Sequence, residues 1–162
     1  MNDTIQPMIA LQNIWDKVIK DRDTIDRNKK AIQFWKQKVS DMTAACVMLE
    51  NDIKKLKAYI KEHEIDLSEK DTHSKKLEER KFSVKTEKEL QAIEHELEKI
   101  NIERGALEDD LLEKMETLSN KEDDFYSKKQ VLDGTSAQSE SDIQNLNLEI
   151  DELTLNITNN EQ

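Results

Sequence analysis

The side chains best suited to chemistry in this chain are one cysteine and three histidines. The sole cysteine is Cys46, which excludes an internal disulfide and any four-cysteine metal site within the chain. The histidines His63, His73 and His95 are too widely spaced to predict a shared metal site, which needs several ligands close together. We therefore expect neither metal nor cofactor chemistry from these residues.

Carboxylates are abundant, but their arrangement does not indicate acid–base catalysis. The run Glu108–Asp110 is typical of a solvated helix face rather than of paired catalytic acids. The sequence has no glycine-rich phosphate loop and no Ser/His/Asp or Cys/His arrangement that can be placed in one pocket. These patterns predict a protein that is not an enzyme.

The composition indicates long helices. Of the 162 residues, 38% are charged and 35% hydrophobic, with two glycines and one proline. A globule of this length needs more apolar volume and more turn residues, whereas a seam between two helices needs little of either. Disorder is the alternative for so polar a chain, and only a regular apolar period can exclude it.

A coiled-coil period is present between Ile32 and Leu67. Steps of three and four give eleven positions, of which ten are apolar, and this spacing keeps one seam facing a partner helix. The eleven are Ile32, Trp35, Val39, Met42, Cys46, Leu49, Ile53, Leu56, Ile60, His63 and Leu67. Upstream, Leu11, Trp15, Val18 and Ile25 extend the stripe, with a change of register expected before Ile32.

A second seam begins at Leu90 and repeats every seven residues to Leu153, with eight of ten positions apolar. Its companion residues lie three positions later at first and four positions later towards the end, so the register shifts between about 111 and 140. Gly134 lies in that window, where we expect a kink or a short break of the helix.

Between the seams, residues 70–86 lose the apolar pattern, and Thr86 with Glu89 resembles a helix capping box. The sequence predicts an all-α, antiparallel two-helix coiled-coil hairpin, kinked near Gly134. We expect helix 1 over about 6–79, a turn at about 79–86 and helix 2 over about 86–158.

Folding about residue 83 makes the arms equal and sets Trp15 near Asp151. The alternative is a single straight helix that dimerises in parallel. The low quality of the seam at residues 70–86 favours the hairpin.

The net charge of −11 is unevenly distributed. Residues 1–69 are neutral, residues 89–162 carry a net −14, and residues 70–88 carry seven basic against four acidic side chains. An acidic rod is repelled by phosphate backbones, so we expect no nucleic-acid binding except at this basic turn. The candidate partner-binding residues there are Lys75, Lys76, Arg80, Lys81 and Lys85; the alternative interpretation is a set of solvated lysines.

Three seam residues admit a second interpretation. Trp15 is expected in the core, but at the open end of a hairpin it is also a candidate partner anchor. His63 fits a tolerated polar position that sets register, and the alternative is a pH sensor. Cys46 is interpreted as a small buried hydrophobe, and the alternative is a reactive thiol.

Residues 84–118 resemble a known family over two runs. The matching residues of the first are Thr86, Lys88, Glu89, Leu90, Ala92, Ile93, Glu96 and Leu97. The second run is Asp109–Glu116, with the sequence Asp-Asp-Leu-Leu-Glu-Lys-Met-Glu. Both are similar to runs in the bacterial coiled-coil proteins that carry a C-terminal four-cysteine zinc ribbon.

This resemblance implies binding to other proteins. Such proteins resemble adaptors for the sigma-54 type of sigma factor and for flagellar or type III secretion components, and nucleic-acid binding has also been ascribed to them. The ribbon's two Cys-x-x-Cys pairs are missing here, so zinc is expected only if a ribbon follows Gln162.

The prediction is thus a cytoplasmic, non-enzymatic adaptor, without membrane insertion, for which a homodimer is an open alternative. The competing functions are a structural spacer or oligomerisation rod, and a nucleic-acid-binding protein whose ribbon is missing.

Overall fold

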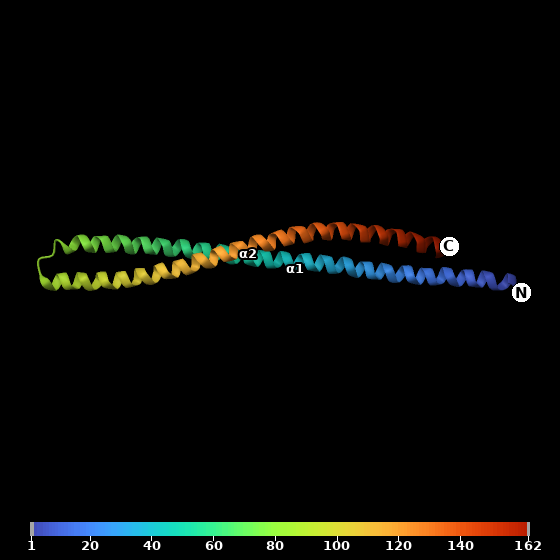
Figure 1. The fold of residues 1–162 in the computed structure, drawn as a ribbon, viewed down its shortest axis with the longest axis horizontal. Helices are drawn as coiled ribbons and strands as arrows, with labels where there is room; N and C mark the ends of the chain where they lie inside the picture. Colours follow the sequence, from blue (N-terminus) through green and yellow to red (C-terminus); the bar gives the residue numbers. More distant parts are fainter. Residues whose placement is uncertain (1, 162) are drawn as a thin grey trace. The chain divides into compact units, whose positions relative to one another are not determined.

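The structure is a computed structural model that describes residues 2–161, with side chains from Ile5 onward. It contains two helices, α1 at Asn2–Lys81 and α2 at Glu87–Glu161, of 80 and 75 residues. Residues 82–86 connect them, and α2 returns antiparallel to α1 (Figure 1). The described part of the chain contains no strand. The predicted all-α antiparallel hairpin is therefore confirmed, and the straight parallel dimer is not the fold.

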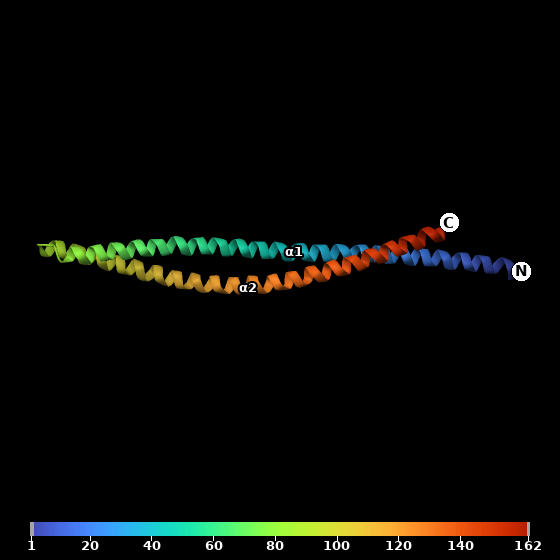
Figure 2. The same cartoon turned by 90° about the horizontal axis from the view of Figure 1, so that it is seen from above.

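The chain divides into two compact units, each built from one segment of either helix. The tip unit comprises residues 46–127 and includes the connection between the helices. The open-end unit comprises residues up to 45 and those from 128 onward. In the tip unit, the segments of α1 and α2 run antiparallel (Figure 2). Ion pairs such as Lys57–Glu122 at 3.5 Å join them.

The first apolar seam faces inward as its period predicts. All eleven seam positions from Ile32 to Leu67 are buried or half-buried, while most residues between them are exposed. In the tip unit, Leu77 is the most buried side chain and packs with Ile93, Leu97 and Ile100. Burial of such side chains from water is the main force that holds the two segments together.

The second seam also faces inward, and of the two expectations at Gly134, a kink or a short break, the break does not occur. All ten heptad positions from Leu90 to Leu153 are buried or half-buried. The companion position changes between Lys121 and Ser136, which agrees with the predicted register shift. The helix nevertheless runs through Gly134 without interruption, and Gly134 has no positive φ. Glycine costs only about 1 kcal/mol in a helix, too little to break one that a continuous seam supports.

As expected, polar residues occupy most inward positions at residues 70–86, but the period of burial continues through them: Lys70 and Lys81 are half-buried, and Ser74 and Leu77 are buried. The side chains of Lys70 and Lys81 reach acidic residues of α2. Lys70 lies 3.4 Å from Glu103, and Lys81 lies 3.6 Å from Glu94. Such snorkelling lets a lysine cover the seam with its aliphatic stem while its ammonium stays hydrated.

The expected change of register before Ile32 is also wrong. Val18, Asp21, Ile25, Asn28 and Ile32 are all buried or half-buried, and they continue the alternation of three and four without a shift. The pattern looked irregular because polar residues occupy two of these seam positions.

The pairing of the arms differs from a fold about residue 83. That fold would place Lys70 beside Glu96, but Lys70 pairs with Glu103, and Glu96 lies 3.4 Å from His73. Trp15 accordingly lies beside Asn160 and Glu161 rather than near Asp151.

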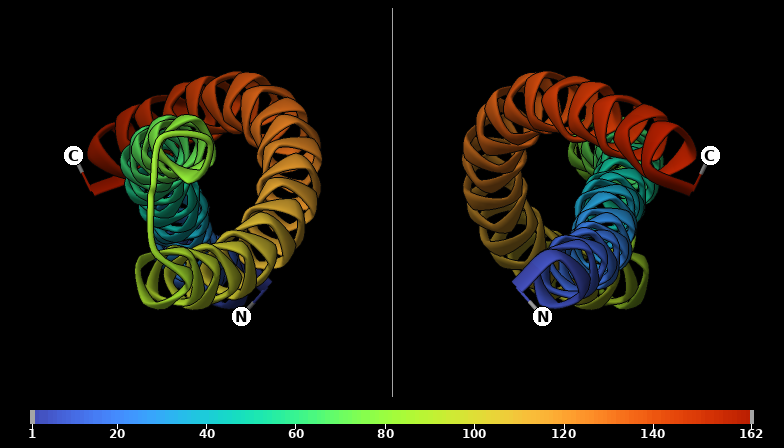
Figure 3. Two further views of the ribbon diagram at one scale, coloured as in Figure 1. Left: turned by 90° about the vertical axis from the view of Figure 1, so that its left-hand side faces the viewer. Right: turned by 90° about the vertical axis from the view of Figure 1, so that its right-hand side faces the viewer.

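The helices are longer than predicted. α1 begins at Asn2 and ends at Lys81, and α2 ends at Glu161. Pro7 therefore lies inside α1, where its ring removes one backbone hydrogen bond. The connection is confined to residues 82–86, as seen end-on in Figure 3.

Candidate functional site

The connection at the hairpin tip is a short loop held at both ends by hydrogen bonds. At the end of α1, the backbone N–H of Ser83 donates to the carbonyl of Arg80 at 3.0 Å. At the start of α2, Thr86 Oγ1 accepts from the N–H of Glu89 at 3.2 Å, which is the predicted N-cap. The reciprocal bond from the Glu89 side chain is not found among the described residues. The loop therefore has a defined path.

Two apolar side chains of this loop point in opposite directions. Val84 packs against the core of Leu77, Ile93, Leu97 and Ile100 and thereby fixes the loop to the seam. Phe82 is 89% exposed, the most exposed large apolar side chain among those described. A single exposed apolar residue is common on protein surfaces. Phe82 is a candidate contact because it is an aromatic ring presented by a loop with a defined path.

Positively charged side chains surround Phe82 in sequence. Lys75, Lys76, Arg80 and Lys85 are exposed, and no ion pair engages them within the described residues. Lys81 differs, because it is half-buried and pairs with Glu94. Four of the five predicted tip residues are therefore exposed cations that a partner could contact. The fifth, Lys81, instead forms an ion pair between α1 and α2.

The residues of the family-like run have mainly structural roles. Thr86 caps α2, Ile93 and Leu97 lie in the core, and Glu96 faces His73 across the helix pair. Leu90 is half-buried, and Lys88, Glu89 and Ala92 have exposed side chains. The run is therefore explained by starting a helix and packing its first turns.

Arg104 fills a heptad position where an apolar residue was expected, and it connects the helices there. Its Nε lies 2.7 Å from Asp71 Oδ1, with both side chains partly exposed. A polar pair at a seam position restricts which register the two helices can adopt. Arg104 and Asp71 therefore help to fix the pairing of the tip unit.

A cluster around Tyr59 forms a second polar contact between the helices. Tyr59 Oη donates to Asp110 Oδ2 at 2.5 Å, and its ring stacks on His63 at 3.8 Å between centroids. The hydrogen bond to Asp110, with smaller contributions from burial and from the charges of Asp110 and Glu113, raises the pKa of Tyr59 above 10.0. His63 is held in place, since its Nδ1 lies 2.8 Å from the Tyr59 carbonyl oxygen.

The raised pKa of Tyr59 is testable by ultraviolet titration. In a Tyr126→Phe background, we expect Tyr59 to ionise at higher pH in the folded chain than in denaturant. The interaction stabilises the fold below the unfolded pKa, and that stability is lost as pH rises through the folded pKa. Asp110→Ala should lower the folded pKa, whereas Asp109→Ala, a change at an exposed neighbour, should not. An unchanged titration in Asp110→Ala would disprove this assignment.

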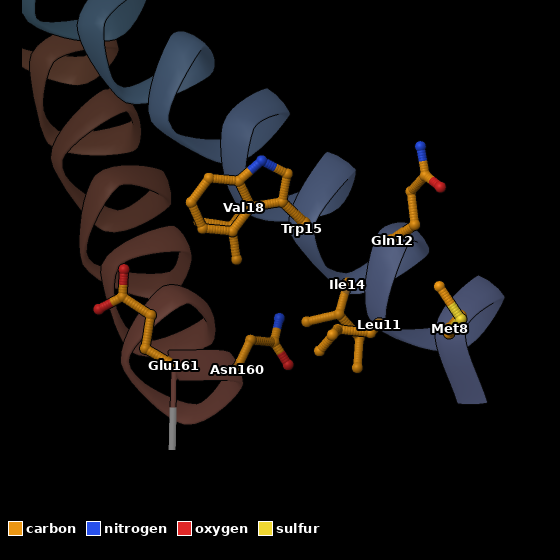
Figure 4. A pocket seen from close by; sticks show the side chains of 8 residues that line it. All are labelled: Met8, Leu11, Gln12, Ile14, Trp15, Val18, Asn160 and Glu161. Carbon is orange, nitrogen blue, oxygen red and sulfur yellow. The ribbon is translucent and has the colours of Figure 1, made fainter. Parts of the chain in front are cut away.

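Trp15 lies at the open end, where α1 borders an apolar groove. The groove has a volume of about 560 Å³, and its walls include Leu11, Trp15 and Val18 of α1. Asn160 and Glu161 at the end of α2 complete it (Figure 4). Trp15 is exposed rather than part of the core, so the partner-anchor interpretation agrees with its position.

The residue pattern predicted the burial of Cys46, but it did not identify Phe82 as a candidate site residue. Cys46 is buried in the seam, as its period predicts. Phe82 was missed because it lies in the connection, outside any seam. The available signal was a large aromatic residue among lysines and arginines in the turn.

The described residues offer neither a metal site nor a membrane span. They contain no group of three or more histidine, cysteine or acidic residues placed to hold a metal ion. Neither helix, as far as it is described, includes a stretch long and apolar enough to cross a membrane.

Comparisons with known proteins agree with this architecture. The chain is similar to CT398 from Chlamydia trachomatis, with a TM-score of 0.77 and 25% sequence identity over 99% of this chain and 71% of that one. No curated protein is significantly similar in sequence. The model of the CT398-like coiled coil hairpin domain matches residues 15–162, which is most of the chain. The chain therefore belongs to the CT398-like coiled coil hairpin domain family.

Proposed function

We propose that this chain is a cytoplasmic, non-enzymatic adaptor that binds an acidic protein surface through its hairpin tip. The observation that carries this proposal is Phe82, which is exposed on a fixed loop near cations that form no ion pair with the described residues. A coiled-coil hairpin fits a structural or interaction role, and the tip supplies a specific contact surface.

The two components of the tip have different energetic roles. Aromatic side chains that enter a pocket of the partner are the usual hot spots of protein interfaces, because they bury much area with few rotatable bonds. Peripheral charges such as Lys76, Arg80 and Lys85 contribute mainly to the rate of association and to the choice of partner. The expected partner therefore has an apolar socket for Phe82 inside an acidic surface.

The resemblance to the zinc-ribbon family suggests which partners to test. We propose a sigma-54 type sigma factor, or a flagellar or type III secretion component, as the partner of this tip. The acidic α2 makes nucleic acid a poor ligand for the rest of the hairpin, because 20 acidic residues lie between 89 and 162.

Binding titrations with the purified partners and two phenylalanine variants test the tip. Phe82→Ala should weaken binding at least about tenfold, the typical loss at a hot spot. Phe34→Ala is the matched control, because Phe34 is 63% exposed but lies in the open-end unit. We expect wild-type affinity for that control.

Charge reversal separates the ionic contribution. The combined change Lys76→Glu, Arg80→Glu and Lys85→Glu should slow association and reduce its dependence on salt, with a smaller effect on dissociation. Equal affinity of Phe82→Ala and wild type would remove the tip from the interface. Failure to bind any of these partners would favour a structural spacer, and a salt-sensitive shift of RNA would favour nucleic acid.

A further inference from the structure

The α1 helix carries an apolar face at the open end that the described chain leaves uncovered. Val18 is buried against α2, and the seam continues outward with Ile14 and Leu11 at the same spacing of four and three. In Figure 4, Leu11, Ile14 and Trp15 project from α1 into the space beside the end of α2. A coiled-coil seam that continues in this way is shaped to receive another helix.

The exposed face is large enough for a stable interface. Within residues 5–19 of α1, seven large apolar side chains are between 42% and 70% exposed: Ile5, Met8, Ile9, Leu11, Ile14, Trp15 and Ile19. At ~200 Å² for Trp15 and ~150 Å² for each aliphatic side chain, they present on the order of 600 Å². Two such faces would bury about 1,200 Å² in total, the lower end of the range for specific, stable interfaces.

The charge pattern indicates what covers this face. Residues 4–15, the charge-free run, contain no charged side chain, although 38% of the chain is charged. At the end of α2, residues 153–160 are also uncharged. The acidic partner expected at the tip finds no cation here, and the matching surface is itself apolar and uncharged.

A second copy of the chain supplies such a surface. In a twofold dimer the same patch meets itself, so the uncharged residues 4–15 bring no like charges together, and Glu161 at the groove wall is paired with Arg22. The rest of α2 would bring like charges together, because residues 89–162 carry a net −14.

We propose that the open-end face is a homodimer interface in which the charge-free runs of two copies pack against each other. Two α1 ends and two α2 ends then form a local four-helix bundle. This inference goes beyond the proposed function and does not depend on it. Each dimer carries two tips, which raises the avidity for a partner that is itself repeated or oligomeric.

Sedimentation analysis of the 162-residue chain and its variants tests the interface. Wild type should dimerise at micromolar concentration. Leu11→Glu should weaken dimerisation at least tenfold, because Leu11 lies in the charge-free run and two carboxylates would meet near the twofold axis. Leu112→Glu is the control, since Leu112 is equally exposed but belongs to the tip unit. Circular dichroism checks that each variant stays helical.

A charge-swap experiment identifies the occupant as a second copy. Leu11→Glu and Leu11→Lys should each be monomeric alone and should form a heterodimer when mixed, because opposite charges then meet at the interface.

Three results would overturn the proposal. The first is a wild-type chain that stays monomeric. If that monomer also sediments with phosphatidylcholine vesicles, the face binds lipid instead of a second copy. The others are a dimer that Leu11→Glu leaves intact, and a mixture of the two variants that does not associate.

Discussion

Replacing Leu77 by alanine should lower the free energy of unfolding by about 2–4 kcal/mol. Leu77 is 1% exposed and lies at the centre of the cluster formed by Ile93, Leu97 and Ile100. Alanine removes the apolar contact and leaves a cavity that two long helices cannot close without moving apart. Urea unfolding followed by circular dichroism measures the effect as a shift of the midpoint at constant slope.

Leu112→Ala is the matched control for this experiment. The side chain is the same, but it is 67% exposed on the outer face of α2 in the same unit. Its replacement should change the unfolding free energy by no more than ~0.5 kcal/mol. If both variants lost equal stability, the assignment of Leu77 to the core would be wrong.

Replacing Asp21 by leucine should stabilise the open-end unit by about 1–3 kcal/mol. Asp21 is 9% exposed at a seam position, and its Oδ2 makes no hydrogen bond within the described part of the chain. Burial of an unpaired polar oxygen costs free energy, and leucine at this position adds an apolar contact instead. Thermal unfolding should therefore show a higher midpoint for this variant.

Asp23→Leu controls for the removal of one negative charge, because Asp23 lies on the exposed face two residues away. We expect a change within ~0.5 kcal/mol for it. A loss of stability in Asp21→Leu would show that this carboxylate has a partner in the folded protein. Polar seam residues such as Asp21 and Asn28 commonly restrict the register of two helices at a cost in stability. In the Asp21→Leu variant, α1 and α2 should therefore be less restricted to one register.

The period of the apolar residues was sufficient to predict the helices and their facing surfaces. From Ile32 to Leu67 every predicted seam position faces inward, including the polar His63. The prediction failed where the seam is polar, at Asp21, Asn28 and Ser74, because those positions are inward for geometric reasons that residue type does not reveal. Supercoil geometry continues through a polar position as long as the flanking turns are packed.

The residue pattern could not predict which of the two apolar residues in the connecting loop is exposed. Val84 and Phe82 are both apolar and only two residues apart, and which of them turns inward depends on the packing of Val84 against the core. The cations of the tip were predictable, because a charge excess is visible in the sequence. The exposed ring among them required the structure.

Photo-cross-linking from the tip tests the central claim most directly. A benzoylphenylalanine at position 82 or at position 34 is irradiated in complex with the purified sigma factor or secretion component that binds the chain. We predict a cross-link from position 82 and none from position 34, because the proposed interface includes Phe82 and excludes Phe34. A complex that cross-links from position 34 but not from position 82 would contradict binding through the tip.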